Sequence, residues 1–486
     1  MNHNNLVPYL FFLLLTKTAT GQADHRFDVK NLQMDFRIMR GALEEAHPGI
    51  YWYRSKLEMD KCFDVAYQEL DHEMTELEFF RTVAPLISKI GCGHTWIATT
   101  ESTQEKIWEK GKVLPLKLKF TSGKAYCIQN NSKDSTAIQP GDEILTINNY
   151  SVDSLLALSN KFSPGDGFIE VGKLKILDNV FNQFFTLYIG QPDKYHVKFK
   201  DGDEQVKEIE IDPLTLKEIE LILKRRYANK TQRENKNITL SFLNNNSAAL
   251  LKIKEFSDWH TDGERIRFRD ELRTSFAKVD SSRTRNLIID LRDNDGGNEN
   301  YGLLLFSYLT NKPFNGYKQI DFRTTRFSFR KYTTTSWSEY MLFKALLKHE
   351  KVNDTTFLLT NSDATRKYQP NGNRFKGNIY ILINRGSFST TSDFAALVYS
   401  NKVAIFIGEE TGGSYFGNTS NYSFLLTLPN TKLKVNIPVA RYQTNVTLND
   451  RFGRGTIPDF EIKYSIDEII QGIDKEMNTV LTLIGK

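Results

Sequence analysis

A pair of serines follows an apolar strand near residue 384 and has the setting of an enzymatic nucleophile. The sequence of residues 379–396 is IYILINRGSFSTTSDFAA, which predicts a buried strand, a turn with Ser387 and Ser389, and then a helix. Backbone N–H groups at a helix start are unpaired, so a serine there can attack a carbonyl with an oxyanion donor beside it. The turn lacks the second glycine of a GxSxG elbow, and taken alone both serines also fit ordinary helix caps.

A pair of glycines follows a second apolar strand. The sequence of residues 286–298 is NLIIDLRDNDGGN, in which the strand ends at Asp290 and a polar turn follows. Gly296 and Gly297 allow backbone N–H groups to approach a substrate oxygen closely. Because the segment also fits a plain strand–turn–helix connection, its functional interpretation depends on the other segments.

His94 is a candidate general base. It lies in the segment IGCGHTWI, residues 90–97, between a predicted helix and a predicted strand, with small residues around it. The chain has 8 histidines, so a reaction that needs an imidazole has few to choose from. The alternative is a structural histidine with satisfied hydrogen bonds. Two further segments, IGEETGG at 407–413 and GTIPDFEI at 455–462, are not diagnostic alone.

The composition excludes several classes of function. Of 486 residues, 40% are hydrophobic and 25% are charged, which is ordinary for a folded soluble protein. Three cysteines without CxxC spacing rule out a cysteine-rich zinc site, and we expect no metal. The net charge of +5 is interspersed, without the basic stripe of a nucleic-acid interface. No GxGxxG or Walker sequence occurs, so we expect no cofactor of the nicotinamide or nucleotide kind.

The N-terminus has the features of an export signal. Residues 6–15, LVPYLFFLLL, form a short apolar run, and a bilayer-spanning helix needs about 20 such residues. Small residues follow, and the sequence near Ala23 fits a cleavage site, although no Lys or Arg precedes the run. We therefore expect residues 1–23 to be a signal peptide and the mature protein to be periplasmic or secreted, without a transmembrane anchor.

The elements that must position these residues begin with a helical domain, residues 24–100. Apolar residues at three-to-four spacing predict helices over 29–46, 56–71 and 75–90. These helices place His94 at the end of the domain, where the last helix gives way to a strand.

A β-rich domain is predicted over residues 112–190. Its segment GDEILTINNY, residues 141–150, resembles the GD-x-I-L-x-I-N-G signature of PDZ domains. Such folds can bind a peptide end as an added strand. The alternative is a small β-rich spacer.

The rest of the chain is predicted to be a hairpin and linker, residues 191–235, and an α/β domain, residues 236–486. Strands and helices alternate in this last domain, as in a layered α/β fold. An aromatic and basic stretch at about 325–376 lacks periodicity and suggests a surface excursion. A capping box, Ser465 with Glu468, predicts one final helix over 466–484.

Together and in this order, these segments resemble the tail-specific (C-terminal-processing) protease family of serine peptidases, which includes tricorn cores and retinoid-binding modules. The family pattern is a PDZ domain, a strand ending in DLR-x-N-x-GG, then L-[IVT]-N-x-x-[ST]-[AF]-S-[AT], G-E-x-T-x-G and PD, matched over about residues 29–470. The resemblance implies a secreted bacterial member. It also implies a crotonase/ClpP-like layered α/β core with an N-terminal helical domain and a PDZ-like β-rich domain.

The resemblance assigns the oxyanion site and the nucleophile. Ser389 matches the family nucleophile, and the N–H of Thr390 matches the oxyanion donor that follows it. Gly296 or Gly297 supplies the second donor, and the pattern does not choose between them.

The resemblance also bears on the base. Some members use a Lys about 25 residues after the serine, but no Lys lies between residues 402 and 432 here. His94 matches the histidine of tricorn-like members, although Gly93 replaces the serine that precedes it there. The expected orienting carboxylate is Asp450, with Glu410 and Asp459 as alternatives.

The predicted function is hydrolysis of peptide bonds in exported or imported polypeptides, with a peptide or an unfolded protein as the partner. One alternative is a ligand-binding protein without catalysis on the same scaffold, as in the retinoid-binding modules. A second alternative is an acyl hydrolase that acts on other substrates with the same serine and histidine.

Overall fold

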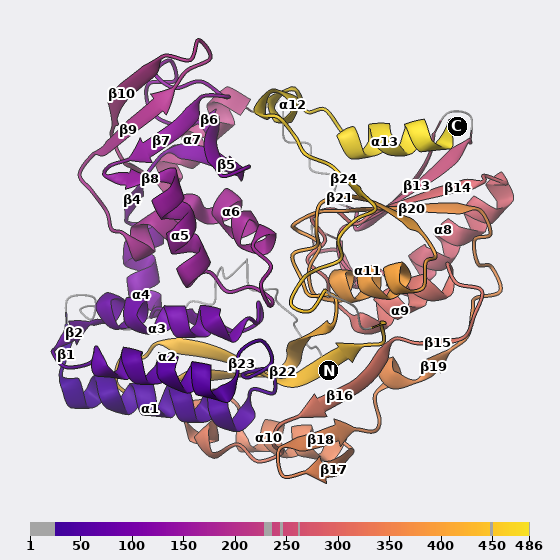
Figure 1. Cartoon of the computed structure of the whole chain (residues 1–486), viewed down its shortest axis with the longest axis horizontal. Coiled ribbons are helices and arrows are strands. Elements are labelled where there is room, and N and C mark those ends of the chain that lie inside the picture. The colour runs from indigo at the N-terminus through magenta and orange to yellow at the C-terminus, as the bar shows by residue number, and fades with distance from the viewer. Residues whose placement is uncertain (1–24, 228–235, 244–245, 261–262, 448–450, 486) are drawn as a thin grey trace.

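The computed structural model describes residues 25–227, 236–243, 246–260, 263–447 and 451–485. The predicted signal peptide, residues 1–23, and Asp450 lie outside these residues. The described chain forms a helical part, a small sheet unit and a larger core built on two sheets (Figure 1). Among its helices, none has both the length and the apolar character needed to cross a bilayer.

The helical part contains the three helices that the apolar spacing predicts. They are α1 (Val29–Ala46), α2 (Lys56–Gln68) and α3 (Glu76–Ile90). Helix α3 begins with a capping box, in which the N–H of Glu78 donates to Thr75 and the N–H of Thr75 donates to the Glu78 carboxylate. It ends at Gly91, whose φ of 72° is a conformation that glycine adopts without steric cost. His94 therefore lies in the turn between α3 and strand β3 (Trp96–Ala98).

The small sheet unit is antiparallel, with the strand order β10-β9-β7-β6-β5 and with β8 paired to β7. Its strands are β5 (Leu116–Thr121), β6 (Lys124–Asn130), β7 (Glu143–Ile147), β8 (Tyr150–Ser151), β9 (Tyr195–Lys200) and β10 (Val206–Ile211). The sequence places the hairpin β9–β10 in a segment of its own, residues 191–235. In the structure β9 pairs with β7, so the sheet continues past residue 190.

Two helices connect the strands of this unit. They are α5 (Val152–Phe162) and α6 (Val171–Tyr188), which packs on β5. Helix α6 is absent from the predicted elements, although its buried residues Leu177, Phe181 and Phe184 follow helical spacing. Residues 163–170, between the two helices, reach the core, where the N–H of Phe168 donates to the carbonyl of Gly453 at 2.8 Å.

The first core sheet has the order β12-β13-β14-β20-β21-β24. Its strands are β12 (Ile238–Leu243), β13 (Ala248–Ile253), β14 (Asn286–Asp290), β20 (Asn378–Ile383), β21 (Ile405–Gly408) and β24 (Phe460–Glu461). Strands β14 and β20 are parallel neighbours, with Asp290 opposite Leu382. Because their carboxyl ends meet at one edge of the sheet, the turn with the two glycines lies beside the turn with the two serines.

The second core sheet has the order β17-β18-β16-β23-β22. Its strands are β16 (Tyr317–Phe322), β17 (His349–Asn353), β18 (Thr356–Leu359), β22 (Gly417–Thr427) and β23 (Lys434–Thr444). Strand β3 pairs with β23, which ties the turn of His94 to the core. Figure 1 shows β23 running beside the N-terminal helices.

The prediction of an irregular excursion over 325–376 is wrong in part. This stretch contains α10 (Trp337–Leu346) and the hairpin β17–β18, which extends the second sheet through the pairing of β18 with β16. Its aromatic side chains explain the lack of a clear period, because Phe327 and Phe343 pack on Phe424 of β22 rather than along one helix.

Besides α10, five helices of the described chain accompany the core sheets. They are α8 (Phe268–Ser282), α9 (Glu299–Ser307), α11 (Thr390–Ser400), α12 (Ile466–Gln471) and α13 (Lys475–Ile484). The single helix predicted over 466–484 is wrong. Gly472, with a φ of 68°, ends α12, and the Asp474 carboxylate then accepts the N–H of Met477 to start α13.

The remaining described elements are short or lie at the edges of the three parts. They are β1 (Arg26–Phe27), β2 (Met74–Thr75), α4 (Glu101–Gln104), η1 (Glu105–Glu109), β4 (Lys112–Val113), β11 (Leu214–Thr215), α7 (Leu216–Tyr227), β15 (Phe314–Asn315), η3 (Ser328–Tyr332), η4 (Asp363–Thr365) and β19 (Lys367–Tyr368).

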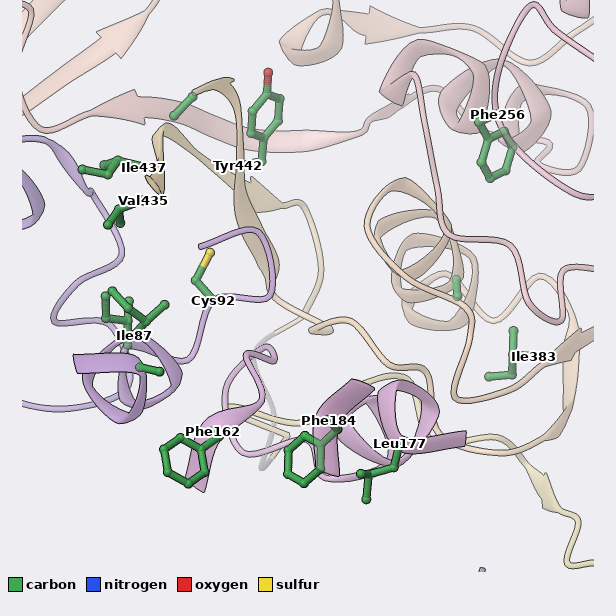
Figure 2. Packing of buried hydrophobic residues seen from close by; sticks show 14 of the residues in the cluster. Ile87, Cys92, Phe162, Leu177, Phe184, Phe256, Ile383, Val435, Ile437 and Tyr442 are labelled. Carbon is green, nitrogen blue, oxygen red and sulfur yellow. The ribbon is translucent and has the colours of Figure 1, made fainter. Parts of the chain in front are cut away.

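One hydrophobic cluster runs through all three parts of the chain. Figure 2 shows members of it from the helical part (Ile87), the small sheet unit (Phe162, Phe184) and the core (Val435, Ile383). Because apolar burial is the main favourable term in folding, this shared cluster holds the turns from different parts of the chain together.

Candidate active site

Ser389 lies at the turn between β20 and α11, in a backbone conformation that serine rarely adopts. Its φ and ψ are 53° and −127°, and its side chain makes no capping hydrogen bond to α11. Such a conformation is costly and occurs where the surrounding structure enforces it, often at functional sites. Ser389 is therefore not the ordinary helix cap that its sequence position also allowed.

Ser387 has a structural role in the same turn. It is fully buried, its hydroxyl donates to the carbonyl of Leu291 at 2.9 Å, and it accepts the N–H of Asn384 at 3.1 Å. These bonds tie the end of β20 to the end of β14. Of the two candidate serines, only Ser389 has a hydroxyl in contact with a base.

The structure brings His94 to Ser389. Nε2 of His94 lies 3.1 Å from Oγ of Ser389, although 295 positions separate the two residues. The imidazole stacks on the ring of Phe388 with centroids 4.9 Å apart, and Asn436 donates to the main-chain carbonyl of His94 at 2.8 Å. Burial lowers the pKa of His94 to about 4, so the ring is neutral near pH 7 and Nε2 can accept a proton.

The other ring nitrogen, Nδ1 of His94, is buried and has no hydrogen-bond partner among the described residues. Neither of the two alternative carboxylates forms a hydrogen bond with Nδ1. Glu410 binds Arg454 and the N–H of Gly455, and Asp459 accepts the N–H of Phe406. The sequence-based choice, Asp450, lies outside the described residues.

Two backbone N–H groups beside Ser389 are available as oxyanion donors. Thr390 is the first residue of α11, and within the described chain its N–H has no acceptor. The N–H of Gly296 already donates to Oδ1 of Asn294 at 2.9 Å. The N–H of Gly297 meets no acceptor in the described ranges, so of the two glycines it is the free donor.

Gly296 faces the nucleophile directly, at a φ of 107°. A Cβ at this position would lie 2.7 Å from Cβ of Ser389 and 2.9 Å from the nitrogen of Thr390, closer than real contacts allow. We expect Gly296→Ala to lower turnover by about 10²-fold or more, because the added methyl displaces the donor or the nucleophile. Steady-state kinetics on a peptide substrate checks this.

Gly123→Ala is the matched control for that substitution. Gly123 also has a positive φ, 76°, but nothing lies within 4 Å of the added Cβ. The substitution there also places an L-residue at a positive φ, but in the turn between β5 and β6, so turnover should stay unchanged. Equal losses in the two variants would show that strain alone causes the effect.

Asn294 organises the two turns and is not among the site residues predicted from the sequence. It is fully buried, its Oδ1 accepts the N–H of Gly296 and the hydroxyl of Thr391, and its Nδ2 donates to the carbonyl of Ile253. Its carbonyl accepts the N–H of Phe388. The signal was the Asn between two Asp residues in DLRDNDGG, where only an amide can accept and donate in this way.

Helix α6 is linked to both turns by charge. Arg385, in the nucleophile turn, binds Glu409 and reaches Asp178 of α6 at 3.3 Å. Lys175 of α6 pairs with Asp293, in the glycine turn. The small sheet unit is thereby connected to the two turns that hold the reacting groups.

Three side chains near the site are of residue types that commonly bind metal ions. Ligand atoms of Cys92, His94 and Asp166 lie within 4.8 Å of one another. The Cys92 thiol already donates to the carbonyl of Thr419, and both Asp166 oxygens accept backbone N–H groups.

Ser389, His94 and two free N–H groups are together sufficient for nucleophilic attack on a carbonyl carbon.

Comparison with known proteins identifies the family of the core. Residues 247–462 match the model of peptidase family S41. No curated protein matches the chain. Among solved structures, mature CPAF in complex with lactacystin is similar, with a TM-score of 0.62 at 15% identity over 94% of this chain and 99% of that chain. The photosystem II D1 C-terminal processing protease aligns over 94% of this chain and 97% of that chain, with a TM-score of 0.41 at 13% identity.

Proposed function

The chain contains a domain of peptidase family S41, a family of serine hydrolases, and from this we propose that it is a serine peptidase that uses Ser389 and His94. The observation that carries the proposal is the 3.1 Å contact between Nε2 of His94 and Oγ of Ser389. A neutral imidazole within hydrogen-bond distance of a hydroxyl is the arrangement of a general base and its nucleophile.

The acylation half of the reaction follows from this geometry. His94 takes the proton of Ser389 at Nε2 while Oγ forms a bond to the substrate carbonyl carbon. The negative charge that develops on the carbonyl oxygen is held by the N–H groups of Thr390 and Gly297. When the intermediate collapses, the C–N bond breaks and His94 donates its proton to the leaving amine, which leaves an acyl group on Ser389.

The deacylation half repeats these steps with water. His94 takes a proton from water as the water oxygen bonds to the acyl carbon, and the same two N–H groups hold the second oxyanion. The bond between carbon and Oγ then breaks, and the proton on Nε2 returns to Ser389. Asp450 is our proposed carboxylate for the orientation of His94, on the strength of the family pattern.

We also propose that the small sheet unit is a PDZ-like unit and that the protein is exported. Its GDEILTINNY segment supports a PDZ-like unit, and a PDZ-like sheet can hold an extended peptide end as an added strand. The layered core, with the reacting groups at strand ends, supports the crotonase/ClpP-like class. Residues 1–23 support export, so the substrates we propose are polypeptides outside the cytoplasm.

The test of this function is a search for cleaved bonds. The purified chain is incubated with an unfolded protein, and mass spectrometry of the products identifies each new terminus. We expect internal peptide bonds to be cut and cleavage to stop after treatment with a serine-directed fluorophosphonate. Hydrolysis of small esters without any peptide cleavage would contradict the proposal in favour of another acyl hydrolase, and binding without hydrolysis would favour a ligand-binding protein.

A further inference from the structure

Asp166 is a buried carboxylate beside the catalytic histidine. It lies in the segment between α5 and α6, is 2% exposed, and has no Lys or Arg partner in the described part of the chain. Oδ1 accepts the N–H of Gly93 at 2.7 Å, and Oδ2 accepts the N–H of Ser414 at 3.2 Å. Asp166 thus holds the peptide that directly precedes His94.

The carboxylate is also close to the ring itself. One of its oxygens lies within 4.8 Å of a ring nitrogen of His94 and of the Cys92 thiol. Nδ1 of His94 is the one polar atom in this group that no described residue satisfies. The segment that carries Asp166 is fixed in place, because Gly167 donates to the carbonyl of Gly91 at 2.9 Å and Phe168 donates to that of Gly453 at 2.8 Å.

The other titratable groups that face Asp166 add no positive charge. Burial raises the pKa of the Cys92 thiol to about 12 and raises that of the Tyr53 phenol, so both are neutral near pH 7. Asp393, in the first turn of α11, is held by Tyr317 and Asn418, and burial raises its pKa to about 7. Among the described groups around Asp166, His94 is therefore the one that can become a cation during the reaction.

We propose that Asp166 is a positioning residue for the reaction: it fixes the turn that carries His94 and offsets the positive charge that the imidazole gains when it takes the proton of Ser389. The proposal rests on the proposed function. A buried imidazolium without a counter-charge is strongly disfavoured, and an opposite charge within about 4–6 Å raises the pKa of a basic group by about 1 to 3. The carboxylate oxygen and the ring nitrogen, which lie within 4.8 Å of one another, are close enough for this effect.

The pH dependence follows from the two groups. Burial raises the pKa of Asp166 to about 6 and lowers that of His94 to about 4. The working state has Asp166 ionised and His94 neutral. The first proton that binds as the pH falls is shared by this neighbouring pair, so activity should rise as the pH rises through about 6 and be lost as the pH falls below it. Without the carboxylate only His94 titrates, and the acid limb of the pH profile, where activity is lost at low pH, should move down toward about pH 4.

The experiment compares Asp166→Asn with the unmodified enzyme in buffer that contains a chelator. We expect the plateau of kcat/KM to fall by about 10- to 100-fold and the acid limb to move to lower pH. Asp166→Glu, which keeps the charge, should retain an acid limb near the original pH even if its plateau is lower. An Asp166→Asn enzyme with an unchanged acid limb would overturn the proposal.

Asp35→Asn is the matched control. Asp35 is a fully buried carboxylate that accepts the N–H groups of Asn430 and Thr431, but it lies in α1, away from His94. A purely structural role for Asp166 predicts the same effect in both variants, whereas our proposal predicts a shifted acid limb only in Asp166→Asn.

A second readout separates this proposal from the proposed function. The pKa of His94 is measured by NMR of labelled imidazole in Ser389→Ala protein, with assignment among 8 histidines by comparison with a His94→Gln sample. We expect the pKa of His94 to fall when Asp166→Asn is added. An unchanged pKa would overturn the role of Asp166 whatever the activity, whereas an unmodified enzyme that cleaves no peptide would overturn the function alone.

Discussion

Ser389→Ala should lower kcat by about 10⁴- to 10⁶-fold and abolish covalent labelling by a fluorophosphonate. The substitution removes the atom that bonds to the substrate carbon, and the neighbouring Ser387 cannot replace it because its hydroxyl is buried in two hydrogen bonds. The oxyanion donors and the substrate contacts remain, so KM should change far less than kcat. Steady-state kinetics and intact mass measurement check the two parts.

Ser400→Ala controls for the loss of a hydroxyl from the same helix. Ser400 is the last residue of α11 and accepts the N–H of Thr447, outside the site. This variant should keep both turnover and labelling. Activity in Ser389→Ala comparable to that of Ser400→Ala would contradict the assignment of the nucleophile.

His94→Gln should lower kcat by a similar factor, about 10⁴- to 10⁶-fold. Glutamine keeps a polar side chain but cannot take the proton of Ser389 near pH 7. Because the serine and the histidine act in one step, their losses should not add: Ser389→Ala with His94→Gln should be no slower than Ser389→Ala alone. The measurement is kcat of the two single variants and the double variant on one peptide.

His72→Gln is the control for that substitution. His72 is exposed and pairs with Asp71 at the surface of the helical part. It should leave kcat unchanged. Two results would contradict a shared proton-transfer step. One is a loss of kcat in the double variant that equals the product of the two single losses, and the other is near-normal kcat in His94→Gln.

The turns that carry chemistry were predictable because their signals are local. An apolar strand, a short polar turn and a helix start occupy about 18 residues around Ser389, and the glycine turn after β14 is equally compact. The capping boxes at Thr75 and Ser465 are local in the same way. The order of these segments then pointed to a serine peptidase, and the match to family S41 agrees.

The parts that were missed depend on distant partners. The hairpin β9–β10 is recognisable from the residues of its turn, but those residues do not indicate that β9 pairs with β7. The hydrogen bonds of Asp166 join it to residues 73 and 248 positions away, and no local pattern distinguishes it from a loop aspartate. The single final helix failed for a different reason, since one glycine with a positive φ outweighs the apolar spacing around it.

The most direct test of the account is the site of fluorophosphonate attachment in the folded chain. The probe reacts with a serine only where a base activates it and N–H groups hold the oxyanion, so it reports Ser389, His94 and the two donors at once. Peptide mapping of the labelled protein should find one adduct, on Ser389, and His94→Gln should greatly slow its formation. An adduct on Ser387, or no adduct in folded and otherwise intact protein, would contradict the account.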